Sequence, residues 1–154
     1  MKRVGVLCLL TIWILSACGK ETSISLDVEQ LAHQLASQLE YDDQLTSLSK
    51  EIGSQLYSYT EEHVEHSHIY VSTGATTEEI AVFQCVDVDR AEEVEDKAKR
   101  RIEAQMESVR NYQPEELSRL ENALVQRHGR YVVVSVSSDP QKAKEIIQEN
   151  IQEK

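Results

Sequence analysis

The stretch "HIYVSTGATTEEIAVFQCV", residues 68–86, decides the fold of this chain. Two runs rich in β-branched and apolar residues, 68–72 and 78–86, flank the short polar segment "TGATT" at 73–77. Such runs on both sides of a Gly-containing turn predict a β-hairpin. A phosphate-binding loop is the alternative for the same segment. That pattern needs more glycines and a following lysine, which this segment lacks, so the hairpin explains it better.

A second strand–turn–strand pattern follows at 123–139, "ALVQRHGRYVVVSVSSD", with Gly129 at the turn. A shift of 52 positions brings "IAVFQ" at 80–84 onto "VVVSV" at 132–136. A helical pattern comes after each of these strands. The chain is therefore expected to contain a repeated strand–strand–helix unit.

Apolar residues at helical spacing occupy much of the remaining sequence. Asp27, with Gln30 three positions later, has the arrangement of a capping box at the start of the first helix. Asp139 followed by Pro140 is typical of the start of another helix. Two more helices are expected over 89–112 and 114–124. These elements predict an α+β fold, a two-layer sandwich in which one antiparallel sheet of about four strands carries helices on one face.

Paired acidic residues recur along the chain and are expected on solvated surfaces. Cys85, in contrast, lies within an apolar run with no basic neighbour in sequence, so we interpret it as a small buried residue rather than a reactive thiol. The acidic pairs are Glu61–Glu62, Glu78–Glu79, Glu92–Glu93 and Glu115–Glu116.

The amino terminus has the features of a secretory signal peptide. Lys2 and Arg3 precede an apolar run of 14 residues, 4–17, which is too short for a comfortable membrane span. A buried core helix is the alternative, but such a helix has a polar face and this run has almost none. Residues 15–18, Leu-Ser-Ala-Cys, resemble the lipobox of bacterial lipoproteins. The resemblance implies cleavage before Cys18 and attachment of acyl chains to its thiol.

Three segments follow from this interpretation: a lipoprotein signal peptide at 1–17, a lipidated cysteine with a short tether at 18–25, and a single α+β domain at 26–154. Acyl chains on Cys18 would hold the protein at the cell membrane, because two or more chains anchor durably. Loss of Lys2 and Arg3 with the signal changes the net charge from −11 to −13. Such a charge repels nucleic acid and an anionic bilayer, so nucleic acid is excluded as a partner.

The segments "LEYDDQLTSL" at 39–48, "YVSTGATTEEIAVFQ" at 70–84 and "SVSSDPQKAKEII" at 135–147 carry a family resemblance. In this order they resemble the bacterial lipoproteins of the domain of unknown function 4358, over residues 26–150. The resemblance implies a small exported lipoprotein. It supplies no assigned activity and no catalytic residues.

A histidine-rich segment, "EEHVEHSH" at 61–68, is the strongest candidate for site chemistry. Imidazole and carboxylate groups are metal ligands. If the segment is extended, His66 and His68 project to the same face, and His63 lies three residues before His66. The competing interpretation is a polar loop before a strand. The sequence therefore assigns no metal site, cofactor or catalytic residue, and whether His63, His66 and His68 bind a metal stays open.

From these observations we expect a membrane-anchored lipoprotein on the extracytoplasmic face of the cell membrane. Its domain would be non-enzymatic and would bind an envelope protein or a cell-wall component. The alternative is a lipoprotein that binds a small molecule or a metal and serves a transporter or sensor.

Overall fold

A computed structural model describes residues 24–153 of the protein. The expected signal peptide, residues 1–17, and residues 18–23 of the tether lie outside this range. No helix within the range combines the length and the apolar character that crossing a membrane requires. The elements in chain order are β1 (Ile24–Ser25), α1 (Val28–Gln38), β2 (Thr46–Ser47), α2 (Lys50–Tyr57), β3 (Val64–Val71), β4 (Glu79–Cys85), α3 (Val88–Val109), α4 (Pro114–Glu121), β5 (Leu124–His128), β6 (Tyr131–Val136), α5 (Pro140–Asn150) and β7 (Gln152–Glu153).

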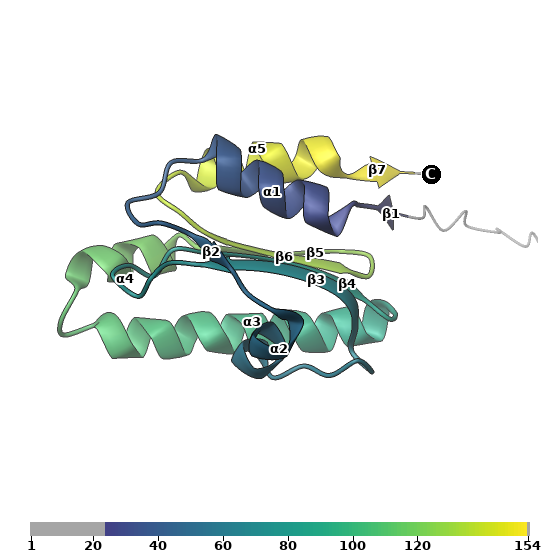
Figure 1. Ribbon diagram of the computed structural model, residues 1–154, viewed down its shortest axis with the longest axis horizontal. Helices are drawn as coiled ribbons and strands as arrows, with labels where there is room; N and C mark the ends of the chain where they lie inside the picture. Colours follow the sequence, from purple (N-terminus) through teal and green to yellow (C-terminus); the bar gives the residue numbers. More distant parts are fainter. Residues whose placement is uncertain (1–23, 154) are drawn as a thin grey trace, which may run out of the picture.

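The main sheet has five antiparallel strands in the order β2-β3-β4-β6-β5, and both expected hairpins are present in it (Figure 1). Gly129 takes the positive φ of +55° that the turn between β5 and β6 requires. A second, two-stranded sheet joins the ends of the described chain, because β1 pairs with β7. β1 consists of Ile24 and Ser25, the last two residues of the expected tether at 18–25.

The predicted helix starts are confirmed by their capping bonds. The Asp27 carboxylate accepts a hydrogen bond from the backbone N–H of Gln30 at 2.9 Å, and Asp139 accepts one from Lys142 at the same distance. Each bond satisfies an amide group that the first helical turn leaves without a partner.

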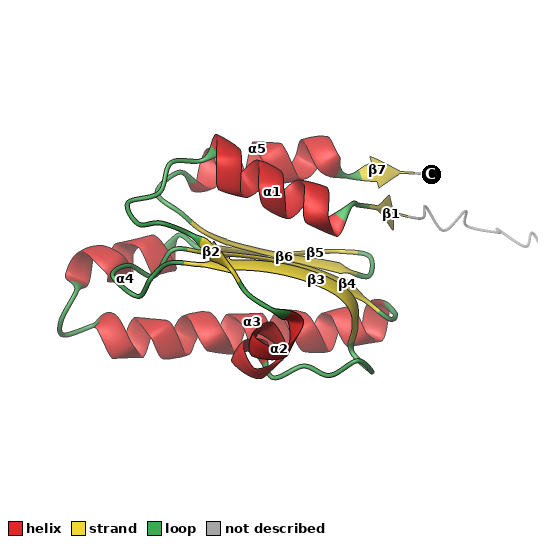
Figure 2. Ribbon diagram, viewed as in Figure 1, coloured by secondary structure: helices red, strands yellow, loops and turns green. Residues whose placement is uncertain are grey.

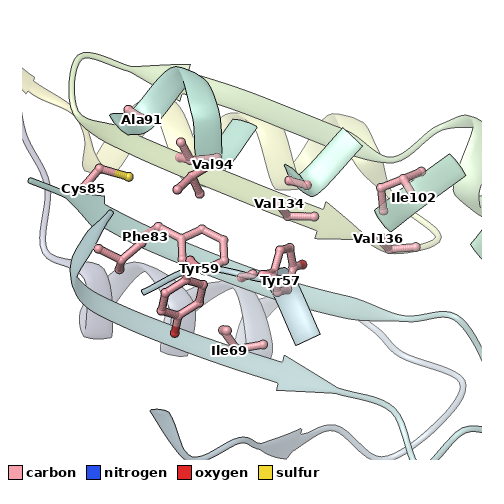
Figure 3. Packing of buried hydrophobic residues seen from close by; sticks show 14 of the residues in the cluster. Tyr57, Tyr59, Ile69, Phe83, Cys85, Ala91, Val94, Ile102, Val134 and Val136 are labelled. Atoms are coloured by element: carbon pink, nitrogen blue, oxygen red, sulfur yellow. The ribbon is translucent and has the colours of Figure 1, made fainter. Parts of the chain in front are cut away.

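Helices cover both faces of the sheet (Figure 2). Ile80 and Val82 of β4 pack beneath α1 and α5, whereas Ala81 and Phe83 of the same strand pack against α2 and α3. On the α3 side, the Phe83 ring meets the rings of Tyr57 and Tyr59 edge-on, with centroid separations of 4.9 and 5.6 Å (Figure 3). Two separate apolar layers result, one on each side of the sheet.

The structure confirms the α+β class and the antiparallel sheet and corrects the details. The sheet has five strands rather than about four, because β2 is two residues long and too short to show a periodic pattern. The expectation of helices on one face, and so of two layers, is wrong. β4 and β6 are apolar at successive positions, as in "IAVF" and "YVVV", and a strand of this kind is buried on both faces.

The repeated unit is present in element order only. β3, β4 and α3 form one strand–strand–helix series, and β5, β6 and α5 form the other. The two helices pack on opposite faces, however. The 52-residue shift accordingly brings Ile80, on the α1 face, onto Val132, on the α3 face.

Truncation of one core residue in each apolar layer should destabilise the protein strongly. Leu35→Ala in α1 and Ile102→Ala in α3 should each lower the free energy of unfolding by about 2–5 kcal/mol, since both side chains are buried. Val88→Ala, at a position that is 51% exposed, is the matched control and should change it by less than about 0.5 kcal/mol. Urea unfolding measures all three. A small effect at either Leu35 or Ile102 would contradict the two-layered core.

Candidate functional site

The structure separates the three histidines of the 61–68 segment. His66 and His68 lie on the same face of β3, as an extended strand requires, where they pair with Gln84 and Val82 of β4. His63 is directed to the other side: its Nδ1 is 2.8 Å from Thr60 Oγ1 and its Nε2 is 3.3 Å from a carboxylate oxygen of Glu93 on α3. Among residues 24–153, no three His, Cys, Asp or Glu side chains gather as a metal site would need.

His66 and His68 form part of an open groove of about 790 Å³, here called the β3 groove. Its lining residues come from the start of α1, the start of α2 and the strands β3, β4 and β6. Its lining is mainly polar, so it suits an extended polar ligand better than a compact apolar one. The lining residues are Ser25–Glu29, Lys50, Glu65–His68, Gln84 and Tyr131.

Carboxylates outnumber amino groups in the β3 groove. Asp27, Glu29 and Glu65 face a single lysine, Lys50. Glu65 accepts hydrogen bonds from Gln84 and Arg130, at 2.9 and 2.8 Å, and the Lys50 ammonium is 2.8 Å from Glu61. The salt bridges of the described residues do not include Asp27 or Glu29. The groove therefore favours a cationic ligand.

A smaller cleft of about 300 Å³ lies between α2, α3 and the β3–β4 turn. Its walls are mostly apolar, with Leu48, Ile52 and Leu56 on one side. Gln105 of α3 also lines it, and the side-chain amide oxygen of Gln105, Oε1, is buried without a hydrogen-bond partner. The cleft has room for a small group only.

The buried carboxylates of the described residues, Glu78, Glu79 and Glu116, lie around the start of β4 and are here called the carboxylate network. Glu78 and Glu79 are each 1% exposed. Glu78 accepts hydrogen bonds from the backbone N–H groups of Asp42 and Asp43, at 2.9 and 3.0 Å. The loop that follows α1 is thereby fixed to the central strand of the sheet.

Glu79 points to the opposite side of the sheet from Glu78. It accepts three hydrogen bonds from Arg101 of α3, two from Nε at 2.9 and 3.2 Å and one from Nη2, and one more from the hydroxyl of Tyr57 in α2. Burial raises the pKa of Tyr57, and the neighbouring Glu79 carboxylate raises it further, so the hydroxyl stays protonated and donates. One carboxylate thus links two helices to the sheet.

Glu116 of α4 completes the network. It accepts hydrogen bonds from the backbone N–H and the hydroxyl of Thr77, at 2.6 and 2.8 Å, and it is paired with Arg119. Burial by itself would raise the pKa of Glu116, but these donors outweigh burial and hold the pKa below its ordinary value. Arg119 also pairs with Asp42, so α4 is attached both to the hairpin turn and to the loop after α1.

The prediction that the acidic pairs lie on solvated surfaces is therefore wrong for Glu78, Glu79 and Glu116. It is confirmed for Glu61–Glu62, Glu92–Glu93 and Glu115, which are exposed. A buried carboxylate needs donors, and apart from the Thr76 hydroxyl, the donors to Glu78 and Glu79 come from residues 22 to 36 positions away. One signal was available in the sequence: "TTEE" directly precedes an apolar strand without an intervening loop.

The segment 73–77 forms the expected hairpin turn, with Gly74 at a φ of +102°. Thr73 donates hydrogen bonds from its backbone N–H and its hydroxyl to one carboxylate oxygen of Asp43, at 2.7 and 2.6 Å. Donors that could cradle a phosphate are thus bound to acidic side chains. The segment therefore does not form an anion site.

Cys85 is buried as predicted. Burial raises the pKa of its thiol to about 12, so the nucleophilic thiolate is scarce near neutral pH.

Removal of the negative charge of Glu79 should destabilise the protein. Glu79→Gln would leave Arg101, which is mostly buried, without its counter-ion, and the free energy of unfolding should fall by about 3 kcal/mol. Glu107→Gln is the matched control: Glu107 pairs with Arg110 on the surface, its side chain is 74% exposed, and the loss should be below about 0.5 kcal/mol. Equal losses in the two variants, measured by urea unfolding, would show that the network does not support the fold.

One family model matches this chain. It is described as a domain of unknown function (DUF4358), and the match covers residues 37–137, about two-thirds of the sequence. The matched range includes β3, β4 and the whole carboxylate network. No curated protein and no solved structure matches the chain.

Proposed function

The chain belongs to the family of the domain of unknown function 4358, and from this premise we propose that it is a lipid-anchored, non-enzymatic binding domain. It is held on the outer face of the cell membrane by acyl chains on Cys18. There it binds another protein of the cell envelope through the β3 groove.

The anchor is inferred from the sequence and from where the fold begins. The lipobox-like residues 15–18 end at Cys18, and the first strand of the domain begins at Ile24. The six residue steps between Cys18 and Ile24 span at most about 22 Å when fully extended. A domain on such a tether stays close to the membrane surface.

The single observation that carries the proposal is the position of the β3 groove at this tethered end. Ser25 to Glu29, which line the groove, are among the first residues of the fold. A partner in the groove would therefore be held within a short distance of the membrane. Small-molecule sites are mostly enclosed and apolar, whereas this groove is open and polar and runs along a strand, which supports a protein partner.

Loss of Cys18 should remove the anchor. In cells grown with a clickable fatty acid, Cys18→Ala should abolish labelling and either release the domain or leave an uncleaved precursor, because only a thiol can form the thioether. Cys85→Ala is the matched control and should stay labelled, since Cys85 is buried in the sheet. Continued labelling of Cys18→Ala would refute the lipoprotein assignment.

A charge reversal in the groove should remove the partner. In intact cells treated with a crosslinker, purification and mass spectrometry should find one envelope protein enriched with the wild-type chain and lost in Glu29→Lys. Glu103→Lys makes the same change at an exposed position of α3, far from the groove lining, and should retain the partner. If no protein is enriched with the anchored wild-type chain, the proposed binding function is wrong.

A further inference from the structure

The outer edge of β3 is largely uncovered. β2 pairs with only two residues of this eight-residue strand, Tyr70 and Val71, and the backbone N–H of Leu48 adds one bond to the carbonyl of Ile69 at 2.9 Å. The chain then turns away into α2 at Lys50. Within the described residues, positions 64–68 of β3 therefore have a strand neighbour on one side only, namely β4.

The direction of the backbone groups along this edge follows from the bond at Ile69. In an antiparallel ladder, the N–H and C=O groups of one residue point to the same side, and successive residues alternate. The Ile69 carbonyl points away from β4, and pairing with β4 is continuous from His66 to Val71. The N–H and C=O groups of Ser67 therefore also point outward, where no described strand pairs with them.

The side chains at this edge are divided between two faces. Ser67 points to the α3 side, where its hydroxyl is 2.7 Å from that of Tyr59. His66 and His68 point to the opposite face, into the β3 groove. The open edge and the acidic groove thus lie side by side.

We propose that β3 accepts an additional antiparallel strand from the partner: an extended segment with Lys or Arg at every second position. This inference rests on the proposed function, because it names the chemical class of the protein partner. The added strand would lie on the same side of β3 as β2, beside residues 64–68, which β2 does not reach. Backbone hydrogen bonds to Ser67 supply affinity, and alternate side chains enter the groove and supply specificity.

The acidic side chains of the β3 groove favour a cationic segment over a second copy of this chain as the strand that pairs with the open edge. Asp27 and Glu29 would meet lysine or arginine side chains that enter the groove. A second copy of this chain would bring the same acidic groove and a domain of strongly negative net charge. Two such edges repel each other, so the occupant is a different protein.

The geometry of an antiparallel pair also determines which backbone N–H groups of the partner donate hydrogen bonds to β3. In an antiparallel pair, a partner residue opposite His66 or His68 has its side chain in the groove and its N–H pointing away from β3. A residue opposite Ser67 has its N–H pointing toward β3. The lysines of an alternating segment therefore occupy the groove, and the residues between them donate the backbone hydrogen bonds.

The test measures binding of a synthetic octapeptide, acetyl-Thr-Lys-Val-Lys-Val-Lys-Val-Thr-amide, to the full chain in detergent by fluorescence anisotropy. N-methylation of the valines should weaken binding at least tenfold, whereas N-methylation of the lysines should change it less than threefold. A peptide with glutamate in place of lysine should bind at least tenfold more weakly. Equal binding of the two N-methylated peptides, or of the lysine and glutamate peptides, would overturn the proposal.

Variants of the chain provide the matching test on the protein side. Ser67→Pro removes the outward N–H and no bond to β4, and should weaken binding of the lysine peptide at least tenfold. Ser67→Ala loses the same contact with Tyr59 but retains the N–H, and should bind within twofold of the wild type. If Ser67→Pro does not fold, the N-methylated peptides decide the question with the wild-type chain.

The two proposals can fail separately. Failure of the lysine peptide to bind, while the wild-type chain still captures an envelope protein in cells, would refute strand addition and leave the binding function intact. Absence of any captured protein would refute the binding function itself.

Discussion

Two consecutive carboxylates, Glu78 and Glu79, hold this fold together at the start of its central strand. Because successive side chains of a strand point to opposite faces, one carboxylate binds the loop after α1 and the other binds α2 and α3. Buried charges are costly unless hydrogen bonds compensate them, and most of the donors here come from segments distant in sequence, namely the loop after α1, α2 and α3. Glu78 and Glu79 therefore reinforce, on opposite faces of the sheet, the attachment that the two apolar layers provide.

The strands of the sheet differ in how completely the rest of the fold covers them. On β4 and β6, both faces are covered by helices, and their residues serve the two apolar layers. β3 is covered by β4 on one edge and only partly by β2 on the other. The uncovered part of the β3 edge, residues 64–68, thus adjoins the acidic β3 groove and the start of α1.

The candidate site was only partly visible in the sequence. Placement of His66 and His68 on one face followed from strand periodicity, and the structure confirms it. That His66 and His68 line one groove together with Asp27 and Glu29 could not be predicted, because Asp27 and Glu29 lie at the start of α1, about 40 positions earlier in the sequence. The position of His63 was equally hidden, since His63 lies before the first residue of β3 and its ring contacts Thr60 and Glu93 of α3.

Local order was determined by the sequence itself. The two hairpins, the capping of α1 and α5 by Asp27 and Asp139, and the burial of Cys85 all follow from periodicity, turn residues and short-range hydrogen bonds. Tertiary structure decided which faces the helices cover, which acidic residues are buried, and which strand edge stays open. The reason is physical: burial of a carboxylate, and coverage of an edge, depend on partners such as Arg101, Arg119 and β2, which only the folded chain brings together.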